Sequence, residues 1–425
     1  MFALDTPTII LIVTGIIGLY MAWNIGANDV ANAMGTSVGS KALTLKQAVI
    51  IAGILEFSGA VFVGSHVADT VRKGIIDPQL FAADPMILLL GMMSALLAAA
   101  MWLQIATYFG LPVSTTHSII GAIIGFALVS VGAAGVDWSV VSQIVMSWVV
   151  SPFMGAIIAY TVFSWIRRFI LGSRDPIQAT LKLAPFLVML VMFIMTLVMV
   201  FKGLKQLHLD LSFEAAVQLG LVIGIISGFI SRFIISRYIK RIDPNELKER
   251  ASEAALNHVE KIFIYLQILS ACFVAFAHGA NDVANAIGPM AAVISIISTG
   301  TVQLAVPIPL WVLVLGGAGI VLGLATWGWR VIETIGKKIT ELTPTRGFAA
   351  EFGAATTIVI ASKLGLPIST THTLVGSVLG VGMARGVASL NLSMVRNILL
   401  SWFVTLPAGA LLSILSFWVL KLVFV

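Results

Sequence analysis

Charged residues are scarce in this chain. They make up only 10% of its 425 residues, whereas a soluble globular protein carries about 25%. Hydrophobic residues reach 59%, and the mean hydropathy is +1.04. This shortage of charge excludes an ordinary soluble domain. The apolar runs that recur along the chain have roughly the 20 residues that a membrane-spanning helix needs.

Several other patterns are missing. The alternation of a transmembrane β-barrel is absent, so helices must satisfy the backbone hydrogen bonds within the bilayer. The single cysteine, Cys272, excludes an internal disulfide. No P-loop, His/Cys metal spacing or nucleophile–base pair is visible, so we do not expect an enzyme. We predict an all-α polytopic membrane protein with about twelve transmembrane segments, the first of them retained because no basic leader or cleavage site precedes it.

The few basic residues predict an orientation. With the N-terminus outside, most of the 25 Lys and Arg residues fall in loops on the inner side, including the charged stretch 241–261. The positive-inside rule therefore favours both termini outside and the central loop in the cytoplasm, in a plasma or inner cell membrane. Because the charge follows the membrane, the net charge of +6 does not indicate a nucleic-acid partner.

Two motifs occur twice. Gly26–Gly35 reads GANDVANAMG and Gly279–Gly288 reads GANDVANAIG; the segments GLPVSTTH and GLPISTTH follow at nearly the same separation. We therefore divide the chain into a first repeat, 1–172, and a second repeat, 261–425. Residues 173–260 join them through two further helices and the charged cytoplasmic loop. Each repeat has an odd number of crossings, so the two are inverted, as in many secondary transporters.

The PVSTTH and PISTTH segments predict helices that begin within the membrane, so we expect the motif helices to be broken or re-entrant. Pro112 and Pro367 suit the first turn of a helix, and each follows a Gly-Leu pair after an apolar run. Free N–H groups and hydroxyls at such a start attract anions. The alternative is that they are ordinary caps of buried helices. The candidate phosphate-binding hydroxyls are those of Ser114, Thr115, Thr116, Ser369, Thr370 and Thr371.

The GANDVANA segments place ionisable residues at membrane depth. Asp29 and Asp282 are functional candidates there, because burying a charge is costly. Their neighbouring asparagines add amide oxygens, so each segment offers the oxygen shell that hard cations prefer. The alternative is structural hydrogen bonding between helices. Neither motif pair contains Arg or Lys, so the charge of a bound oxyanion must be offset by helix ends and by cations.

Two glutamates in apolar runs are weaker candidates. Glu56 and Glu351 could line the ion path or carry a proton, or they could serve as hydrogen-bonded links between helices. They do not occupy equivalent positions in the two repeats.

The doubled motifs resemble the inorganic phosphate transporter (PiT) family of secondary carriers over nearly the whole chain. The resemblance implies phosphate uptake coupled to sodium in many members and to protons in others. It also implies that Asn28, Asp29, Asn281 and Asp282 carry ions or substrate. We assign Asn28 and Asn281 to phosphate, and sodium to Asp29, Asn32, Asp282 and Asn285. Glu56 and Glu351 match acidic positions that matter for transport in the family.

The sequence thus predicts a sodium/phosphate symporter that works by alternating access. One alternative is a proton-coupled carrier of phosphate, sulfate or a metal–phosphate complex, and another is an anion channel. We expect no cofactor besides sodium ions as co-substrate. The expected partners are phosphate, sodium or protons and the lipid bilayer; the sequence leaves open whether the chain forms a homodimer.

Overall fold

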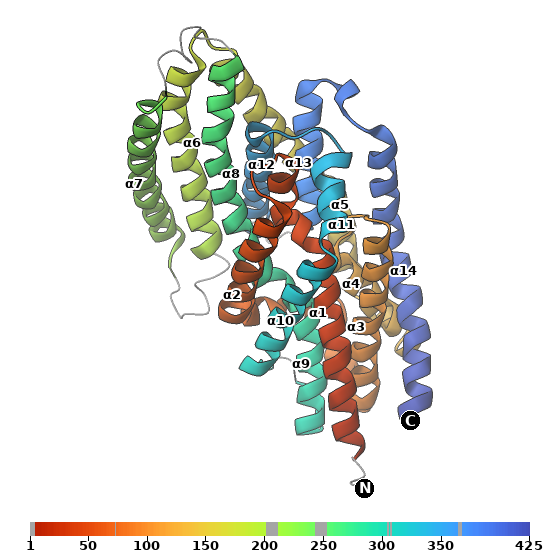
Figure 1. The fold of residues 1–425 in the computed structure, drawn as a ribbon. Helices are drawn as coiled ribbons and strands as arrows, with labels where there is room; N and C mark the ends of the chain where they lie inside the picture. Colours follow the sequence, from red (N-terminus) through yellow and green to blue (C-terminus); the bar gives the residue numbers. More distant parts are fainter. Residues whose placement is uncertain are drawn as a thin grey trace.

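The structure is a computed structural model that describes residues 5–72, 74–200, 211–242, 253–303, 306, 308–363 and 368–425. These residues are almost entirely helical, with one isolated bridge between Ile76 and Val136. The long helices run side by side (Figure 1). Large apolar side chains such as Phe229, Phe403 and Leu411 are exposed on the outside. A lipid-facing surface needs such side chains, so the predicted all-α membrane class is confirmed.

The bounds of the helices follow the apolar runs closely. They are α1 Thr6–Gly39, α2 Leu45–Arg72, α3 Pro85–Tyr108, α4 Thr115–Ser130, α5 Trp138–Ile166, α6 Pro176–Val198, α7 Phe213–Ile239, α8 Glu253–Asp282, α9 Ala284–Thr299, α10 Leu310–Thr326, α11 Trp329–Glu333, α12 Pro344–Lys363, α13 Thr370–Arg385 and α14 Leu392–Phe424.

Eight helical segments of the described chain are long and apolar enough to cross a membrane, or nine if α10 and the helical segment after its 55° bend count as one span. Helices α4 and α13 have 16 residues each. At about 1.5 Å per residue they cannot cross a hydrocarbon core of about 30 Å alone. The total number of membrane crossings, about twelve from the sequence, therefore stays a prediction.

Helices of one predicted repeat pack against helices of the other in matched pairs. Helix α1 packs on α10 while α8 packs on α2, and α4 packs on α14 while α13 packs on α5. Glycines allow the closest approaches: a Cβ added to Gly26 would lie 1.9 Å from the Ile320 carbonyl oxygen, and one added to Gly279 would lie 2.1 Å from that of Glu56. Small residues at such crossings are typical of membrane helix pairs.

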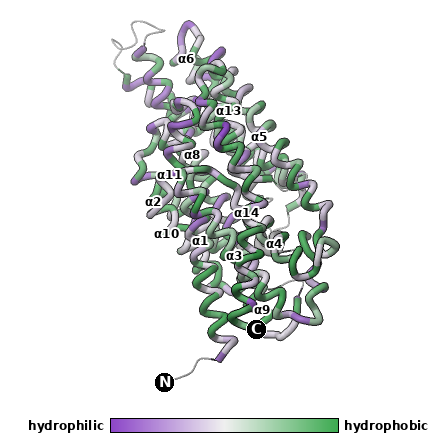
Figure 2. Tube along the Cα trace, turned by 90° about the vertical axis from the view of Figure 1, so that its right-hand side faces the viewer, coloured by the Kyte–Doolittle hydropathy of each residue, from purple (hydrophilic) through white to green (hydrophobic). Residues whose placement is uncertain are grey.

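Helices α6 and α7 form an antiparallel pair at one side of the bundle (Figure 1). They correspond to the two linking helices predicted within 173–260, while residues 243–252 of the charged loop lie outside the described residues. Hydrophilic stretches gather toward the end of the molecule near the start of α6 (Figure 2). The repeat boundaries and the orientation of the termini stay predictions.

The expectation of broken motif helices holds for the second GANDVANA segment but not for the first. The first GANDVANA segment lies within the continuous helix α1, whereas the second is interrupted at Val283, between α8 and α9. Pro289, where the first copy has Thr36, lacks the N–H that would bond the Asn285 carbonyl and so weakens the helix beside this break. Pro112 precedes the cap of α4 rather than lying in its first turn, and Pro367 lies outside the described residues.

Candidate functional site

Two helix N-termini form one side of the site. Helix α4 begins after Ser114, whose hydroxyl oxygen accepts a hydrogen bond from the His117 N–H at 3.2 Å. Helix α13 begins after Ser369, which accepts from the His372 N–H at 3.2 Å. Both serines therefore act as caps, the alternative raised by the sequence. Each hydroxyl keeps its own hydrogen to donate, so capping does not exclude a contact with an anion.

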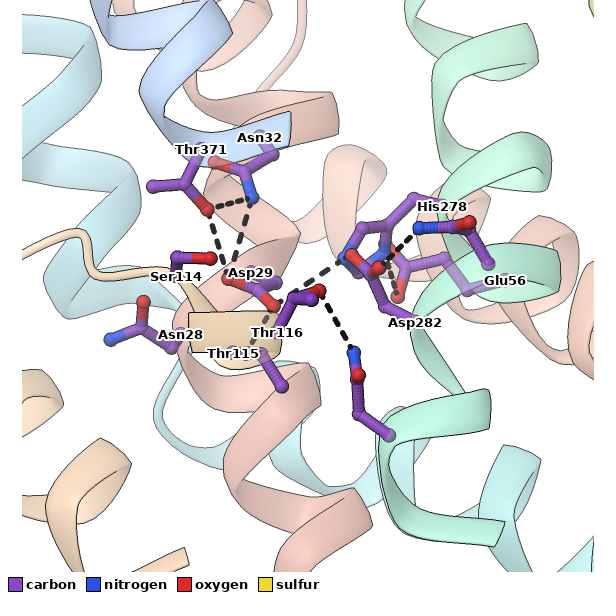
Figure 3. A network of polar contacts seen from close by, with 12 residues as sticks. Asn28, Asp29, Asn32, Glu56, Ser114, Thr115, Thr116, His278, Asp282 and Thr371 are labelled. Carbon is purple, nitrogen blue, oxygen red and sulfur yellow. Dashed lines mark hydrogen bonds and ion pairs between the residues drawn. The ribbon is translucent and has the colours of Figure 1, made fainter. Parts of the chain in front are cut away.

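Asp29, in the C-terminal half of α1, contacts the starts of both short helices (Figure 3). Thr115 donates a hydrogen bond of 2.5 Å to Asp29 Oδ2, and Thr371 donates one of 3.3 Å to Asp29 Oδ1. The Asn32 amide donates to Thr371 at 2.8 Å and to Asp29 at 3.4 Å. The structure thus brings an acidic residue of the first motif to the STTH segments of both predicted repeats.

The second motif reaches the same region with different contacts. The Asn285 amide donates to Thr116 Oγ1 at 3.4 Å, which mirrors the bond from Asn32 to Thr371. Asn281 donates to Asp282 Oδ1 at 2.7 Å. The site is therefore built from both copies, but the two copies are not in the same arrangement.

The side-chain amide of Asn28 makes hydrogen bonds within the first predicted repeat. Its Nδ2 donates to Thr107 Oγ1 at 2.9 Å and to the Leu111 carbonyl at 3.1 Å, and its Oδ1 accepts from the Val113 N–H at 3.1 Å. Asn28 thus holds the segment that leads into α4. A direct contact with phosphate, as predicted from sequence, requires some of these bonds to break.

A histidine that the sequence did not single out lies among three carboxylates. His278 Nε2 lies 2.9 Å from Asp282 Oδ2 and 3.9 Å from Asp29 Oδ2, and its Nδ1 lies 3.3 Å from Glu56 Oε2 (Figure 3). Its counterpart in the first predicted repeat is Ile25, so the repeat itself does not identify this histidine. The four-residue spacing from His278 to Asp282 on one helix was the available signal.

All four groups of this cluster are buried. One imidazole cannot neutralise three carboxylates, and unpaired buried charge is costly. Asp29, His278 and Asp282 each offer a ligand atom, and these atoms lie within 4.8 Å of one another. The side-chain oxygens of Asn32 and Asn285 are also buried, without a hydrogen-bond partner among the described residues. Carboxylate and amide oxygens of this kind are the ligands that hard cations prefer.

The two predicted glutamates have different surroundings. Glu56 is paired with His278. Glu351 accepts hydrogen bonds from Thr36 at 2.5 Å and Ser37 at 3.1 Å on α1, and from Gln267 at 3.4 Å and Ser270 on α8. Glu351 therefore links α1, α8 and α12 through donors that suit its charged form.

A small cavity lies beside this cluster, among α1, α6, α8, α12 and α13. Its lining is mainly apolar and includes no Lys or Arg among the described residues. Thr370 faces it from the first turn of α13. The other polar lining residues are Asn32, His278, Asn281 and Glu351.

The chain matches known proteins over nearly its whole length. A sequence profile described as the phosphate transporter family matches residues 25–413. The chain is similar to a Pyrococcus abyssi protein with the provisional name phosphate permease, at 49% identity over 413 residues, covering 97% of this chain and 98% of that protein. It is also similar to inorganic phosphate transporter 2-1, chloroplastic, of Arabidopsis thaliana, at 47% identity, covering 96% and 71% of the two chains. A solved structure titled the sodium-dependent phosphate transporter superposes with a TM-score of 0.86 at 45% identity, covering 97% of this chain and 99% of that chain.

Proposed function

Because the chain belongs to the phosphate transporter family, we propose that it imports inorganic phosphate in symport with sodium by alternating access. The observation that carries this proposal is the position of Asp29. This buried carboxylate on α1 accepts hydrogen bonds from Thr115 and Thr371. Thr115 is the first residue of α4, and Thr371 is the second residue of α13. A cation on Asp29 and an anion at the two helix starts would therefore be neighbours.

Phosphate would bind at the N-termini of α4 and α13. Each helix end carries roughly half a positive charge and free N–H donors, which suits an oxyanion without any arginine. Thr370 lines the cavity, and the hydroxyls of Ser114, Thr115, Thr116, Ser369 and Thr371 stand at the same two helix starts. We propose these six residues as the phosphate ligands, with Asn28 positioning the loop and Asn281 contacting the ligand from the cavity wall.

Sodium would bind at Asp29 and Asn32 and at Asp282 and Asn285. The support is chemical: carboxylate and amide oxygens are the ligands of hard cations, and two of the amide oxygens are buried without a partner among the described residues. When Thr115 and Thr371 turn their hydroxyls toward phosphate, Asp29 loses donors and needs a cation. Each ion therefore improves the binding of the other, which is the linkage that symport requires.

The cluster around His278 supports the second candidate, proton coupling. His278 and the carboxylates of Asp29, Glu56 and Asp282 form a connected set of groups that could carry a proton. In that mechanism Glu56 and Glu351 would serve the proton path. A channel is disfavoured, because the paired arrangement of the two halves suits alternating access.

We place the protein in a cell membrane with both termini outside. We propose no enzymatic activity and no cofactor besides sodium. Whether two copies associate as a homodimer can be measured on the purified protein.

Uptake into liposomes tests the function. Purified protein is reconstituted, and radiolabelled phosphate uptake is compared under an inward sodium gradient at equal pH and under an inward proton gradient without sodium. Uptake with sodium alone is expected. Uptake with the proton gradient alone would mean that Asp29 and Asp282 carry protons rather than bind sodium. Uptake of sulfate in place of phosphate would refute the assignment of phosphate as the substrate.

A further inference from the structure

The cavity beside the site is lined mostly by the second predicted repeat. Val274 and Ala277 line it from α8, and Ala354, Ala355 and Ile358 line it from α12. The motif alignment gives each of them a counterpart in the first repeat. These counterparts are Met21 and Asn24 on α1 and Ala99, Ala100 and Leu103 on α3.

The counterparts are closely packed in this structure. Met21, Asn24, Ala99, Ala100 and Leu103 are all at 0% exposure, and α1 packs directly on α3. The second predicted repeat therefore lines a small cavity at positions whose counterparts in the first predicted repeat are closely packed. In an inverted repeat the two arrangements are expected to exchange during transport.

Asn24 is hard to explain as an ordinary core residue. Its Nδ2 donates to the Tyr20 carbonyl at 2.9 Å, but its Oδ1 is buried without a partner among the described residues. Leaving an amide oxygen unpaired in an apolar core destabilises the fold, because the oxygen has lost its hydrogen bonds to water. Nearby, the Tyr20 hydroxyl donates to Gln104 and ties α1 to α3. A polar group of this kind makes sense if the region fills with water or ions in another state.

We propose that Met21, Asn24, Ala99, Ala100 and Leu103 line a second cavity, which opens toward the opposite side of the membrane and admits hydrated phosphate and sodium to the site. The cavity opens when α1 and α3 separate, the Tyr20–Gln104 bond breaks and the cavity beside α12 closes. Asn24 then offers its free amide oxygen to the ions that pass. This inference rests on the alternating access of the proposed function.

The proposal distinguishes two faces of α3. Ala99, Ala100 and Leu103 follow helical spacing and share a face. Ala98 is equally buried, at 0% exposure, but lies four residues after Ser94, whose hydroxyl is 3.2 Å from Ser413 on α14. Ala98 therefore faces α14 and should stay packed in both states. It is a matched control for Ala99.

The test is thiol labelling from each side of the membrane. The one native cysteine is first removed by Cys272→Ala, and Ala98→Cys, Ala99→Cys and Ala354→Cys are made singly. Each variant is exposed to a membrane-impermeant thiol reagent in intact cells and in inside-out vesicles, with phosphate uptake measured in parallel. Ala100→Cys replaces Ala99→Cys if the latter does not fold.

Ala99→Cys should react from one side and Ala354→Cys from the other, each at least about tenfold faster than Ala98→Cys, because a thiol packed in an apolar core is inert. Labelling of Ala99→Cys should block uptake. The proposal fails if Ala99→Cys reacts no faster than Ala98→Cys, or if it reacts from the same side as Ala354→Cys. If the two variants are labelled from opposite sides but the protein does not take up phosphate, the second cavity is supported and the assignment of phosphate as the substrate is refuted.

Discussion

Thr115, the first residue of α4, donates a hydrogen bond of 2.5 Å to Asp29 in the C-terminal half of α1. A charge-assisted bond of this kind is among the stronger hydrogen bonds in proteins. It places a carboxylate directly beside a helix start that would attract an anion. In the proposed symport, a bound phosphate would bring a second negative charge beside the Asp29 carboxylate, and a cation would have to offset both charges. The contact would then link cation binding to anion binding.

The aspartates give the first prediction. Asp29→Asn and Asp282→Asn should each lower sodium-driven phosphate uptake at least about tenfold, because the amide lacks the charge that would hold the cation and an interaction with a charged group contributes about 1.5–3 kcal/mol. Size-exclusion profiles should remain those of the wild type. The control is Asp137→Asn, an exposed cap of α5 where Asn caps equally well. Wild-type uptake by a folded double variant would refute the assignment of the cation site.

Thr370 tests the phosphate site. Thr370→Val keeps the shape but removes the hydroxyl, and the KM for phosphate should rise about tenfold, since a hydrogen bond to a charged group contributes about 1.5–3 kcal/mol. Thr370→Ser should restore the wild-type KM. Thr357→Val is the comparison on α12, because the Thr357 hydroxyl bonds the Gly353 carbonyl of its own helix at 2.8 Å. Equal KM values for both valine variants would argue against phosphate binding at Thr370.

His278 can be tested through stability. His278→Leu leaves the carboxylates of Asp29, Glu56 and Asp282 without their imidazole, and the apparent Tm should fall. Sodium chloride should raise the Tm of this variant more than choline chloride does, and by more than in the wild type, because a bound cation replaces the lost partner. His117→Leu, at a buried histidine that accepts from Trp148, should show no such sodium effect. Equal changes in Tm with both salts would refute the proposal that a cation binds at this cluster.

Replacing glycine by alanine should change the thermal stability differently at two positions of α1, Gly26 and Gly15. Gly26→Ala should lower the Tm, because its Cβ would overlap the Ile320 carbonyl, and such overpacking costs about 1–3 kcal/mol or more. Gly15→Ala, where no atom lies within 4 Å of the added Cβ, should be neutral or stabilising by about 0.5–1 kcal/mol. Thermal unfolding of both purified variants checks this. A stable Gly26→Ala protein would mean that α1 and α10 pack less closely.

Local patterns in the sequence determined much of this protein. Apolar runs predict the helices, and the STTH segments predict where two short helices begin, because helix formation and capping depend on neighbouring residues. Ser114 and Ser369 indeed cap the two short helices that they were expected to open.

Only the tertiary structure decided how the two copies differ. The same eight residues form continuous helix around Asp29 and a broken one around Asp282, and Asn28 and Asn281 have different partners. His278 meets Glu56 and Asp29 only because α8 packs on α2 and α1. These contacts join residues that are far apart along the chain, so the energy of each depends on the packing of whole helices rather than on local sequence.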